Sequence, residues 1–302
     1  MQSDPIRPLN VLAPAKINLY LHITGQREDG YHLLDSLVAF VDIGDEILIE
    51  PAQDFSLKIT GPFAGSFTAS DRDASPDSSN LISRAVWNLS RAAQKIPNIK
   101  ITLTKNLPLA SGLGGGSSDA AATLWGLLEW WKIPTNAPYL EDLMLQLGSD
   151  VPVCLTCQSS HMTGIGDILN PLQSLPETPI LLVNPGTPCQ TDLIFQNYSK
   201  PYQSPITMPE SFDDSKQLVD FLAAQTNDLT ESAVEVAPQI TQILSSLDQQ
   251  KGCLLSRMSG SGATCFGLFN TKEDVMDAAE HISCQQPSWW VRAGTLGTPE
   301  RY

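Results

Sequence analysis

The feature that most constrains this chain is a run of glycines placed just before a helical pattern. Residues 108–120 read PLASGLGGGSSDA, with four glycines within five positions. Glycine lacks a Cβ atom, so the backbone can turn tightly here and approach a ligand closely. Ser117, Ser118 and Asp119 are typical of a helix start, where unpaired N–H groups and the helix dipole favour phosphate oxygens. The sequence therefore predicts a phosphate-binding turn between a strand and a helix, in preference to an ordinary flexible turn.

Two familiar phosphate loops do not match this segment. No Gly-Lys-Ser or Gly-Lys-Thr follows the glycines, so the loop is not a Walker A motif. Ser117 stands where the third glycine of the dinucleotide-binding G-x-G-x-x-G pattern would fall, which leaves a nicotinamide-dependent oxidoreductase as a distant alternative. The glycines alone therefore leave the ligand open.

The composition indicates a folded protein that does not bind nucleic acid generically. The 302 residues are 42% hydrophobic and 17% charged, which suits one large domain or two ordinary ones. Acidic residues outnumber basic ones by 33 to 18, and the formal net charge of -15 is opposite to that of proteins that cover DNA or RNA phosphates. A small anionic ligand remains compatible, because clustered backbone N–H groups need no net positive charge.

We expect a cytoplasmic protein, monomeric or homodimeric, without a membrane partner. The sequence holds no stretch of 18 apolar residues that could span a bilayer. Residues 1–10 are polar and lack the apolar core of a signal peptide.

The cysteines favour a structural role. Cys154 and Cys157 form a C-x-x-C pair, which is a possible sign of zinc or redox chemistry. No second pair with ligand spacing follows, and the surrounding residues, DVPVCLTC, are predicted to form a buried strand. We therefore expect small, reduced thiols in the core.

The distribution of apolar residues predicts an α+β chain in two lobes with a cleft between them. Apolar runs and turns alternate through the first fifty residues, as in a predominantly antiparallel sheet. Helical spacing predicts helices near residues 80–94, 117–131, 216–225, 234–249 and 271–284. We place an amino-terminal domain at residues 1–160 and a carboxy-terminal domain at residues 161–302.

Two further segments add chemistry to the glycine loop. In PAKINL, Lys16 and Asn18 lie on the same face of a predicted strand. A lysine in an apolar strand is costly to bury unless it meets an anion. Near the carboxy terminus, residues 258–266 read MSGSGATCF, a second glycine-rich turn that leads into a strand.

In this order the three segments resemble the signature motifs of the GHMP kinases, a family that includes galactokinase, homoserine kinase and mevalonate kinase. Residues 25–32, GQREDGYH, and 147–153, LGSDVPV, resemble the branch that phosphorylates a diphosphocytidyl-linked methylerythritol for isoprenoid precursor synthesis. The match covers residues 11–269, with gaps. It implies a two-domain α+β fold, with an amino-terminal domain like ribosomal protein S5 domain 2 and a ferredoxin-like carboxy-terminal domain.

The resemblance implies roles for individual residues in ATP-dependent phosphoryl transfer with Mg²⁺. Asp150 would be the general base and Lys16 would stabilise developing charge beside it, which suits a reaction governed by positioning and electrostatics. No metal ligands are implied. The residues expected to bind ATP are Asn80, Lys105, Pro108, Leu109, Ala110, Ser111, Gly112, Leu113, Gly114, Gly115, Gly116, Ser117 and Ser118.

The resemblance also implies an acceptor pocket for the cytidyl group. Tyr31 would pack on the cytosine and His32 would hydrogen-bond to its edge, while Phe195 would stack on the other side. Thr191 belongs to the same segment as Phe195, and Asn18 would contact the acceptor near Lys16.

Several alternatives stay open at this level. Asp150 could be a turn or cap residue, and Asn80 and Lys105 could be surface residues. Family members often have glycine at the position of Ala110 and alanine at that of Ser111, so the first turn of the loop could differ. Another GHMP kinase would have no use for the GYH segment, and a non-catalytic ligand sensor would need no Lys16 and Asp150 pair.

Overall fold

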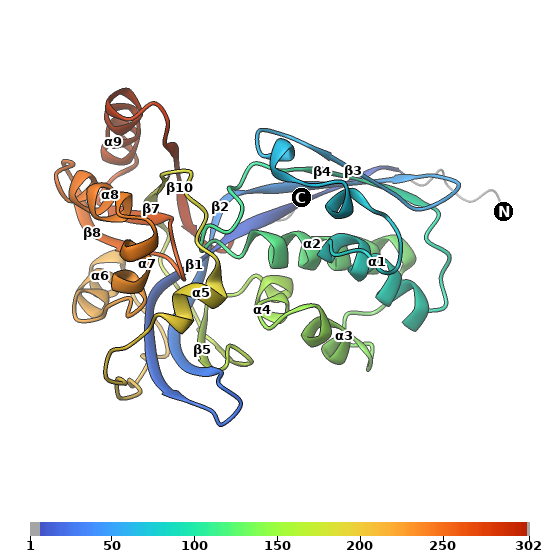
Figure 1. Cartoon of the computed structure of the whole chain (residues 1–302), viewed down its shortest axis with the longest axis horizontal. Coiled ribbons are helices and arrows are strands. Elements are labelled where there is room, and N and C mark those ends of the chain that lie inside the picture. Colours follow the sequence, from blue (N-terminus) through green and yellow to red (C-terminus); the bar gives the residue numbers. More distant parts are fainter. Residues whose placement is uncertain (1–6, 301–302) are drawn as a thin grey trace.

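The computed structural model describes residues 7–300 and has two lobes (Figure 1). The first six residues of the polar amino-terminal segment lie outside the described residues. The strands are β1 (Leu9–Gln26), β2 (His32–Pro51), β3 (Ser56–Thr60), β4 (Ile99–Thr104), β5 (Ser160–Gly164), β6 (Ile168–Pro171), β7 (Thr178–Asn184), β8 (Cys253–Met258), β9 (Cys265–Phe269) and β10 (Trp290–Gly297).

Nine α-helices occur within the described residues. They are α1 (Leu81–Ala92), α2 (Gly115–Trp131), α3 (Leu140–Leu147), α4 (Val151–Thr156), α5 (Thr191–Gln196), α6 (Ser215–Ala223), α7 (Thr230–Val236), α8 (Gln239–Asp248) and α9 (Lys272–Gln285). Within residues 7–300, no helix is long and apolar enough to cross a membrane.

A long antiparallel hairpin, β1 with β2, runs through both lobes. The strands have 18 and 20 residues and pair over nearly their whole length. In the amino-terminal lobe the end of β2, residues 46–51, also pairs with β4. The earlier residues 34–38 of β2 pair with β5, and residues 40–41 pair with β10. Strand β10 continues the sheet to β7, β9 and β8. The predicted antiparallel character is confirmed except for the parallel pair β3 and β4.

In the amino-terminal lobe α2 packs against the hairpin, and α1, α3 and α4 pack on α2 (Figure 1). Helix α2 lies on β1 and is buried on most sides, with α1 and α4 beside it. Strand β4 alternates buried and half-buried residues, as expected of a sheet with one face on the core. The core contains Val11, Ile47, Ile49, Ile82, Val86, Leu89, Ile101, Leu103, Leu124 and Leu127.

The carboxy-terminal lobe buries both faces of its part of the sheet. Successive side chains of a strand point to opposite faces. Accordingly, Leu181 and Val183 of β7 pack in a core with α8 and α9, whereas Ile180 and Leu182 pack in a second core with α6. The continuous apolar run of β7 is explained by this double burial.

Two sequence predictions of secondary structure are wrong. The predicted strand at residues 151–155 is helix α4, with Pro152 in the first turn, where proline is tolerated in a helix. A short apolar run cannot distinguish a strand from a buried helix. The predicted helix over residues 234–249 is divided into α7 and α8 at Ala237 and Pro238, because proline cannot continue a helix.

The other predicted helices are confirmed within a few residues of their bounds. Cys154 and Cys157 are buried on and directly after α4. The division at residue 160 stays a prediction, since the sheet continues from one lobe into the other.

Candidate active site

A cleft of about 1280 Å³ collects most of the predicted site residues. Its lining includes residues of β1, the glycine loop, the start of α4, helix α5 and the loop after β8. Ligand pockets commonly measure ~300–1,000 Å³, so this cleft has room for two ligands. Of the predicted residues, Leu113 and Ser118 do not line it, because Leu113 is in the core and the Ser118 hydroxyl donates to the carbonyl of Pro14.

The glycine loop is held against β1 by backbone contacts. The N–H of Lys16 donates to the carbonyl of Leu113 over 2.9 Å. Helix α2 begins at Gly115, and its N-cap residue Gly114 has a left-handed backbone with φ of 62°. The first N–H groups of a helix have no partner within the helix. The predicted strand, turn and helix are therefore confirmed, and the turn presents the helix start to the cleft.

Two glycines of the loop have no space for a side chain. A Cβ on Gly112 would lie 2.2 Å from the carbonyl oxygen of Ser259, and φ at Gly112 is 77°. A Cβ on Gly114 would lie 2.9 Å from Cε of Lys16. The glycines thus permit the loop to contact both the lysine strand and the second glycine-rich turn. Ala110 also has a left-handed φ of 47°, which explains why glycine suits its position.

Lys16 and Asp150 face each other in the cleft. The Lys16 ammonium lies 3.3 Å from Oδ2 of Asp150 and donates to Oδ1 of Asn18 over 3.1 Å. Lys16 is only 4% exposed, and a charge buried to that extent needs such partners. Asp150 occupies the N-cap position of α4, but its side chain makes no capping hydrogen bond. The alternative that Asp150 caps a helix therefore has no support from the geometry.

A β-bulge lies directly beside these residues. The register of β1 against β2 shifts between Asn18 and Tyr20. Bulges redirect side chains and are frequent next to active sites. The amide of Asn18 donates to the hydroxyl of Ser36 over 2.8 Å, so the orientation of Asn18 is fixed from the neighbouring strand.

The second glycine-rich turn bridges the glycine loop and β1. The Ser259 hydroxyl donates to the carbonyl of Gly112 over 2.9 Å and accepts from the N–H of Asn18 over 3.1 Å. The N–H of Thr264 donates to the carbonyl of Ser111. Through Ser259, the predicted phosphate loop and the lysine strand are kept at a fixed separation.

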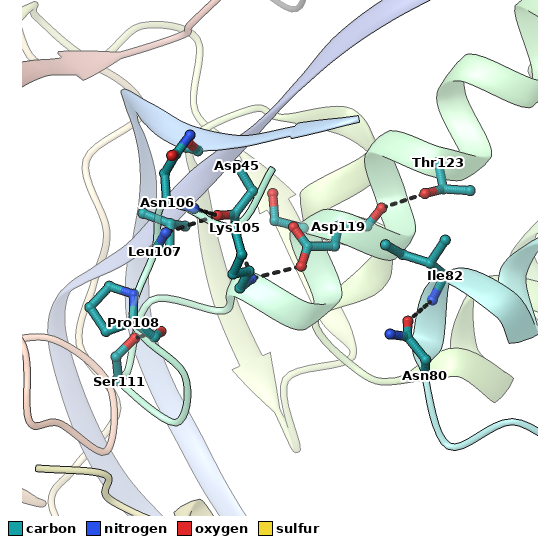
Figure 2. Close-up of polar contacts among 12 residues, drawn as sticks. Asp45, Asn80, Ile82, Lys105, Asn106, Leu107, Pro108, Ser111, Asp119 and Thr123 are labelled. Carbon is teal, nitrogen blue, oxygen red and sulfur yellow. Dashed lines mark hydrogen bonds and ion pairs between the residues drawn. The ribbon is translucent and has the colours of Figure 1, made fainter. Parts of the chain in front are cut away.

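Lys105 is buried in a charged cluster beside the loop, as Figure 2 shows. Its ammonium lies 2.6 Å from Oδ2 of Asp45 and 2.7 Å from Oδ2 of Asp119. Oδ1 of Asp45 accepts the N–H groups of Asn106 and Leu107, which lead into the loop. Lys105 is 2% exposed, so the alternative that it is a surface residue is wrong.

The cluster holds two carboxyl groups and one ammonium, and the protonation follows from their partners. Burial raises the pKa of Asp119 well above its usual range, and the nearby charge of Asp45 raises it further. Burial opposes the charge of Lys105, but Asp119 and Asp45 outweigh it and raise the lysine pKa. Within the described residues, Oδ1 of Asp119 has no hydrogen-bond partner. We therefore assign the proton to Asp119 and the negative charge to Asp45, which accepts three hydrogen bonds.

Asn80 begins the neighbouring helix α1. Its Oδ1 accepts the N–H of Ile82 over 2.9 Å, as Figure 2 shows, and its amide donates to the carbonyl of Asp71. Asn80 is thus an N-cap residue that also lines the cleft.

The other end of the cleft is aromatic. The His32 and Phe195 rings are 5.5 Å apart between centroids, and Tyr198 meets His32 edge to face at 5.8 Å. Tyr31 lines the cleft but is 62% exposed. At the start of α5 the Thr191 hydroxyl lies 3.0 Å from the hydroxyl of Ser261 in the second glycine-rich turn.

The sequence prediction missed four residues that support this site: Asp45, Asp119, Ser259 and Tyr198. Asp119 stands within the glycine motif and Ser259 within the second glycine-rich turn, so both lie in segments that the sequence already indicated to be functional. Asp45 follows Gly44 in an ordinary strand pattern, and Tyr198 follows α5 without a recognisable motif. Only the fold reveals that Tyr198 lines the cleft and that Asp45, fully buried, pairs with Lys105 behind it.

Models of two related families match the chain. The GHMP kinases N terminal domain matches residues 80–158, and the GHMP kinases C terminal domain matches residues 210–287. These matches include the glycine loop, α2, Asp150 and the second glycine-rich turn.

Among similar proteins are two named 4-diphosphocytidyl-2-C-methyl-D-erythritol kinase. The protein of Paramagnetospirillum magneticum is 42% identical over 289 residues, covering 95% of this chain and 98% of the relative. That of Cereibacter sphaeroides is 46% identical over 283 residues, covering 92% and 96%.

Solved structures agree with these matches. A crystal structure of 4-(cytidine 5'-diphospho)-2C-methyl-D-erythritol kinase has a TM-score of 0.76 at 30% identity, covering 96% of this chain and 99% of the other. Homoserine kinase from Cytophaga hutchinsonii has a TM-score of 0.66 at 17% identity, covering 100% and 98%, which shows a shared fold alone.

Proposed function

Because this chain belongs to the GHMP kinases, in the family of the 4-diphosphocytidyl-2-C-methyl-D-erythritol kinases, we propose that it phosphorylates that diphosphocytidyl alcohol. The reaction transfers the γ-phosphate of ATP to the 2-hydroxyl, giving the 2-phosphate and ADP, in the non-mevalonate route to isoprenoid precursors. The expected two-domain α+β fold of the family is the fold of this chain.

The observation that carries the mechanism is the Lys16 and Asp150 pair between the two ends of the cleft. The carboxylate of Asp150 accepts the proton of the attacking hydroxyl, and the nearby ammonium stabilises the oxygen as its charge grows. Asn18 holds the lysine from the other side and contacts the acceptor. A general base contributes ~10²–10⁴-fold to such a step, and the remainder comes from positioning and electrostatics.

The glycine loop binds the ATP phosphates through backbone N–H groups at the start of α2. This placement is supported by the helix dipole, which favours anions at its amino-terminal end. The buried ammonium of Lys105 adds positive charge behind the loop, while Asn80 contacts the nucleotide from α1. The other proposed contacts of the loop lie between Pro108 and Ser117, apart from Leu113, whose side chain is in the core.

The charges of the cleft support a role for Mg²⁺. Besides the protonated Asp119, its lining holds the aspartates Asp29, Asp71, Asp150 and Asp192 against the lysines Lys16 and Lys105. ATP brings further negative charge that these two cations do not balance. Mg²⁺ usually takes one or two carboxylates and keeps waters and substrate phosphates, so it would need few ligands from the lining besides the ATP phosphates. Bound there, the ion would neutralise charge on the transferred phosphoryl group.

The aromatic end of the cleft recognises the cytosine. Neutral His32 hydrogen-bonds to the base edge, because burial lowers its pKa below the ordinary value and the ring then keeps one acceptor nitrogen. Phe195 and Tyr31 pack on the faces of the base, and Thr191, on the same helix as Phe195, also contacts the acceptor. We further propose that the enzyme acts in the cytoplasm as a monomer or homodimer.

An ADP-release assay with a panel of acceptors tests this function. We expect turnover with the diphosphocytidyl alcohol and ATP in the presence of Mg²⁺, and none with homoserine, mevalonate or free cytidine 5'-diphosphate. Mass spectrometry and ³¹P NMR of the product should place the new phosphate on the 2-hydroxyl. Equal turnover of homoserine or mevalonate would assign a different acceptor, and ligand binding without any turnover would indicate a sensor.

A further inference from the structure

The His32 ring is held by aromatic contacts alone. Within residues 7–300, no hydrogen bond involves its ring nitrogens, although the ring lines the cleft. Phe195 lies 5.5 Å away at an interplanar angle of 33°, and Tyr198 lies 5.8 Å away at 84°. Both separations are within the range at which aromatic rings attract each other. His32 is therefore positioned without using either nitrogen.

Tyr198 is itself fixed in place from several directions. Its N–H donates to the carbonyl of Phe195, so the two rings that flank His32 come from one turn at the end of α5. Its hydroxyl donates to the carbonyl of Pro201 over 3.0 Å. The ring of Tyr202 stacks on it at 6.4 Å with an angle of 15°.

The segment that carries Tyr198 is tied to the hairpin that carries His32. The N–H of Gln203 donates to the carbonyl of Ile23 in β1 over 2.8 Å. Gln26, three residues further along β1, pairs with His32 at the start of β2. Tyr198 and His32 thus meet because both of their segments are tied to the end of β1.

We propose that Tyr198 is a positioning residue that orients His32 for recognition of the pyrimidine base of the acceptor. A pyrimidine such as cytosine presents an amino donor beside a ring-nitrogen acceptor. A neutral imidazole can pair with such an edge only when one ring nitrogen points at it, because each nitrogen hydrogen-bonds within the plane of the ring. Tyr198 fixes that plane and leaves both nitrogens to the ligand. The proposal rests on the function proposed above and adds a residue that determines its substrate specificity.

Kinetics of two substitutions at one position test the proposal. Tyr198→Leu removes the edge-to-face contact and should raise KM for the diphosphocytidyl alcohol by about 3–10-fold, the factor that an aromatic pair is worth. The value of kcat and the KM for ATP should stay near wild type, because neither the Lys16 and Asp150 pair nor the glycine loop contacts Tyr198. Tyr198→Phe keeps the ring and should restore the wild-type KM.

A matched control measures the general cost of removing a tyrosine. Tyr139 is half-buried against the amino-terminal core and does not line the cleft. Tyr139→Leu should leave the KM of the acceptor unchanged even if it lowers the unfolding temperature. An equal rise of KM in this control would assign the effect to lost stability and overturn the proposal.

The orientation of His32 can be observed without catalysis. The chain has four histidines, so the His32 ring signals can be assigned by NMR from the spectrum of His32→Ala. Tyr198→Leu should shift these signals and weaken binding of cytidine 5'-diphosphate by the same factor as KM, while Tyr198→Phe should do neither. If wild type fails to phosphorylate the alcohol, the proposed function fails, and these two measurements still decide the role of Tyr198.

Two results would overturn the role itself. Unchanged affinity for cytidine 5'-diphosphate in Tyr198→Leu would show that His32 does not depend on this ring. A defect in Tyr198→Phe as large as that in Tyr198→Leu would assign the effect to the hydroxyl and its bond to Pro201.

Discussion

The two ends of the cleft are held together by different forces. The phosphate end, residues 108–116 with Asp45, Lys105 and Ser259, is fixed by buried hydrogen bonds and ion pairs. The acceptor end, Tyr31, His32, Phe195 and Tyr198, is half-buried or exposed and is held mainly by ring contacts. A buried polar network permits few arrangements, because each unpaired member is costly. Ring contacts are weaker and tolerate more variation.

The end with the buried polar network is the one we propose to bind the phosphoryl donor. The end held by ring contacts is the one we propose to bind the acceptor, which determines substrate specificity. The proposed donor of this kinase is ATP, and a loop held by polar contacts to Asp45 and Ser259 suits a ligand that stays the same. The acceptor differs between kinases, and an exposed cluster of rings can be altered without disturbing a core. We therefore expect substitutions at the phosphate end to be more severe than those at the acceptor end.

The largest effect should come from Asp150, which lies between the two ends. Asp150→Asn should lower kcat by ~10²–10⁴-fold, because the amide cannot accept the hydroxyl proton. The affinity for ATP, measured by calorimetry, should stay near wild type. Asp142→Asn, in the exposed first turn of α3, is the matched control. A variant that keeps more than about a tenth of the wild-type rate would contradict a role as general base.

A large effect confined to the phosphate end should follow from Gly112→Ala. The added Cβ would overlap the carbonyl of Ser259, and alanine is strained by ~1–2 kcal/mol at a left-handed φ. The affinity for ATP should fall by at least about 10-fold while the affinity for cytidine 5'-diphosphate is retained. Gly65→Ala, where a Cβ would meet open space, should change neither. An equal loss of both affinities would mean that the two ends are not independent.

A smaller effect confined to the acceptor end is expected for His32→Ala. The lost hydrogen bond should lower kcat/KM for the diphosphocytidyl alcohol by about 10-fold, the factor for ~1.4 kcal/mol. The KM for ATP should not change, since the glycine loop lies at the other end. Varying each substrate in turn separates these parameters. A raised KM for ATP, or an unchanged kcat/KM for the diphosphocytidyl alcohol, would contradict the role of His32 in a cytosine pocket.

The smallest effect concerns the proton of Asp119. Burial and Asp45 raise its pKa, so the folded chain keeps a proton that the unfolded chain releases above about pH 4. Stability is therefore lost as the pH rises through this unfolded pKa towards the folded one. Asp119→Asn does not titrate and should unfold a few degrees higher than wild type at pH 8, with a smaller difference at pH 5. A difference that is the same at both pH values would place the proton elsewhere.

Much of the phosphate end could be predicted from the sequence, because its information is local. Consecutive glycines, a helix start and a lysine two residues from an asparagine each have a direct geometric meaning. The α4 helix could not be predicted, since a run as short as VPVCLT fits a strand equally well. The placement of Asp150 at the start of that helix instead of a strand is visible only in the structure.

The long-range contacts could not be predicted for a different reason. Asp45 and Lys105 are 60 residues apart, and Ser259 and Gly112 are 147 apart. Such pairs form because strands pair across the sheet and because distant segments of the chain come back to the same place in the fold. Neither can be read from the spacing of residues along the sequence. The same holds for Tyr198, whose contact with His32 exists only because residues 197–203 fold back onto β1.

The continuous β1 and β2 hairpin restricts how the cleft can close. In many two-domain enzymes the domains rotate about a few loop residues. Here the lobes share two long strands joined along most of their length, and bending them sharply would break ladder bonds worth about 1 kcal/mol each. We therefore expect both lobes to keep their positions relative to each other when substrate binds. Deuterium exchange throughout the hairpin would then be slow without ligand and unchanged upon ligand binding.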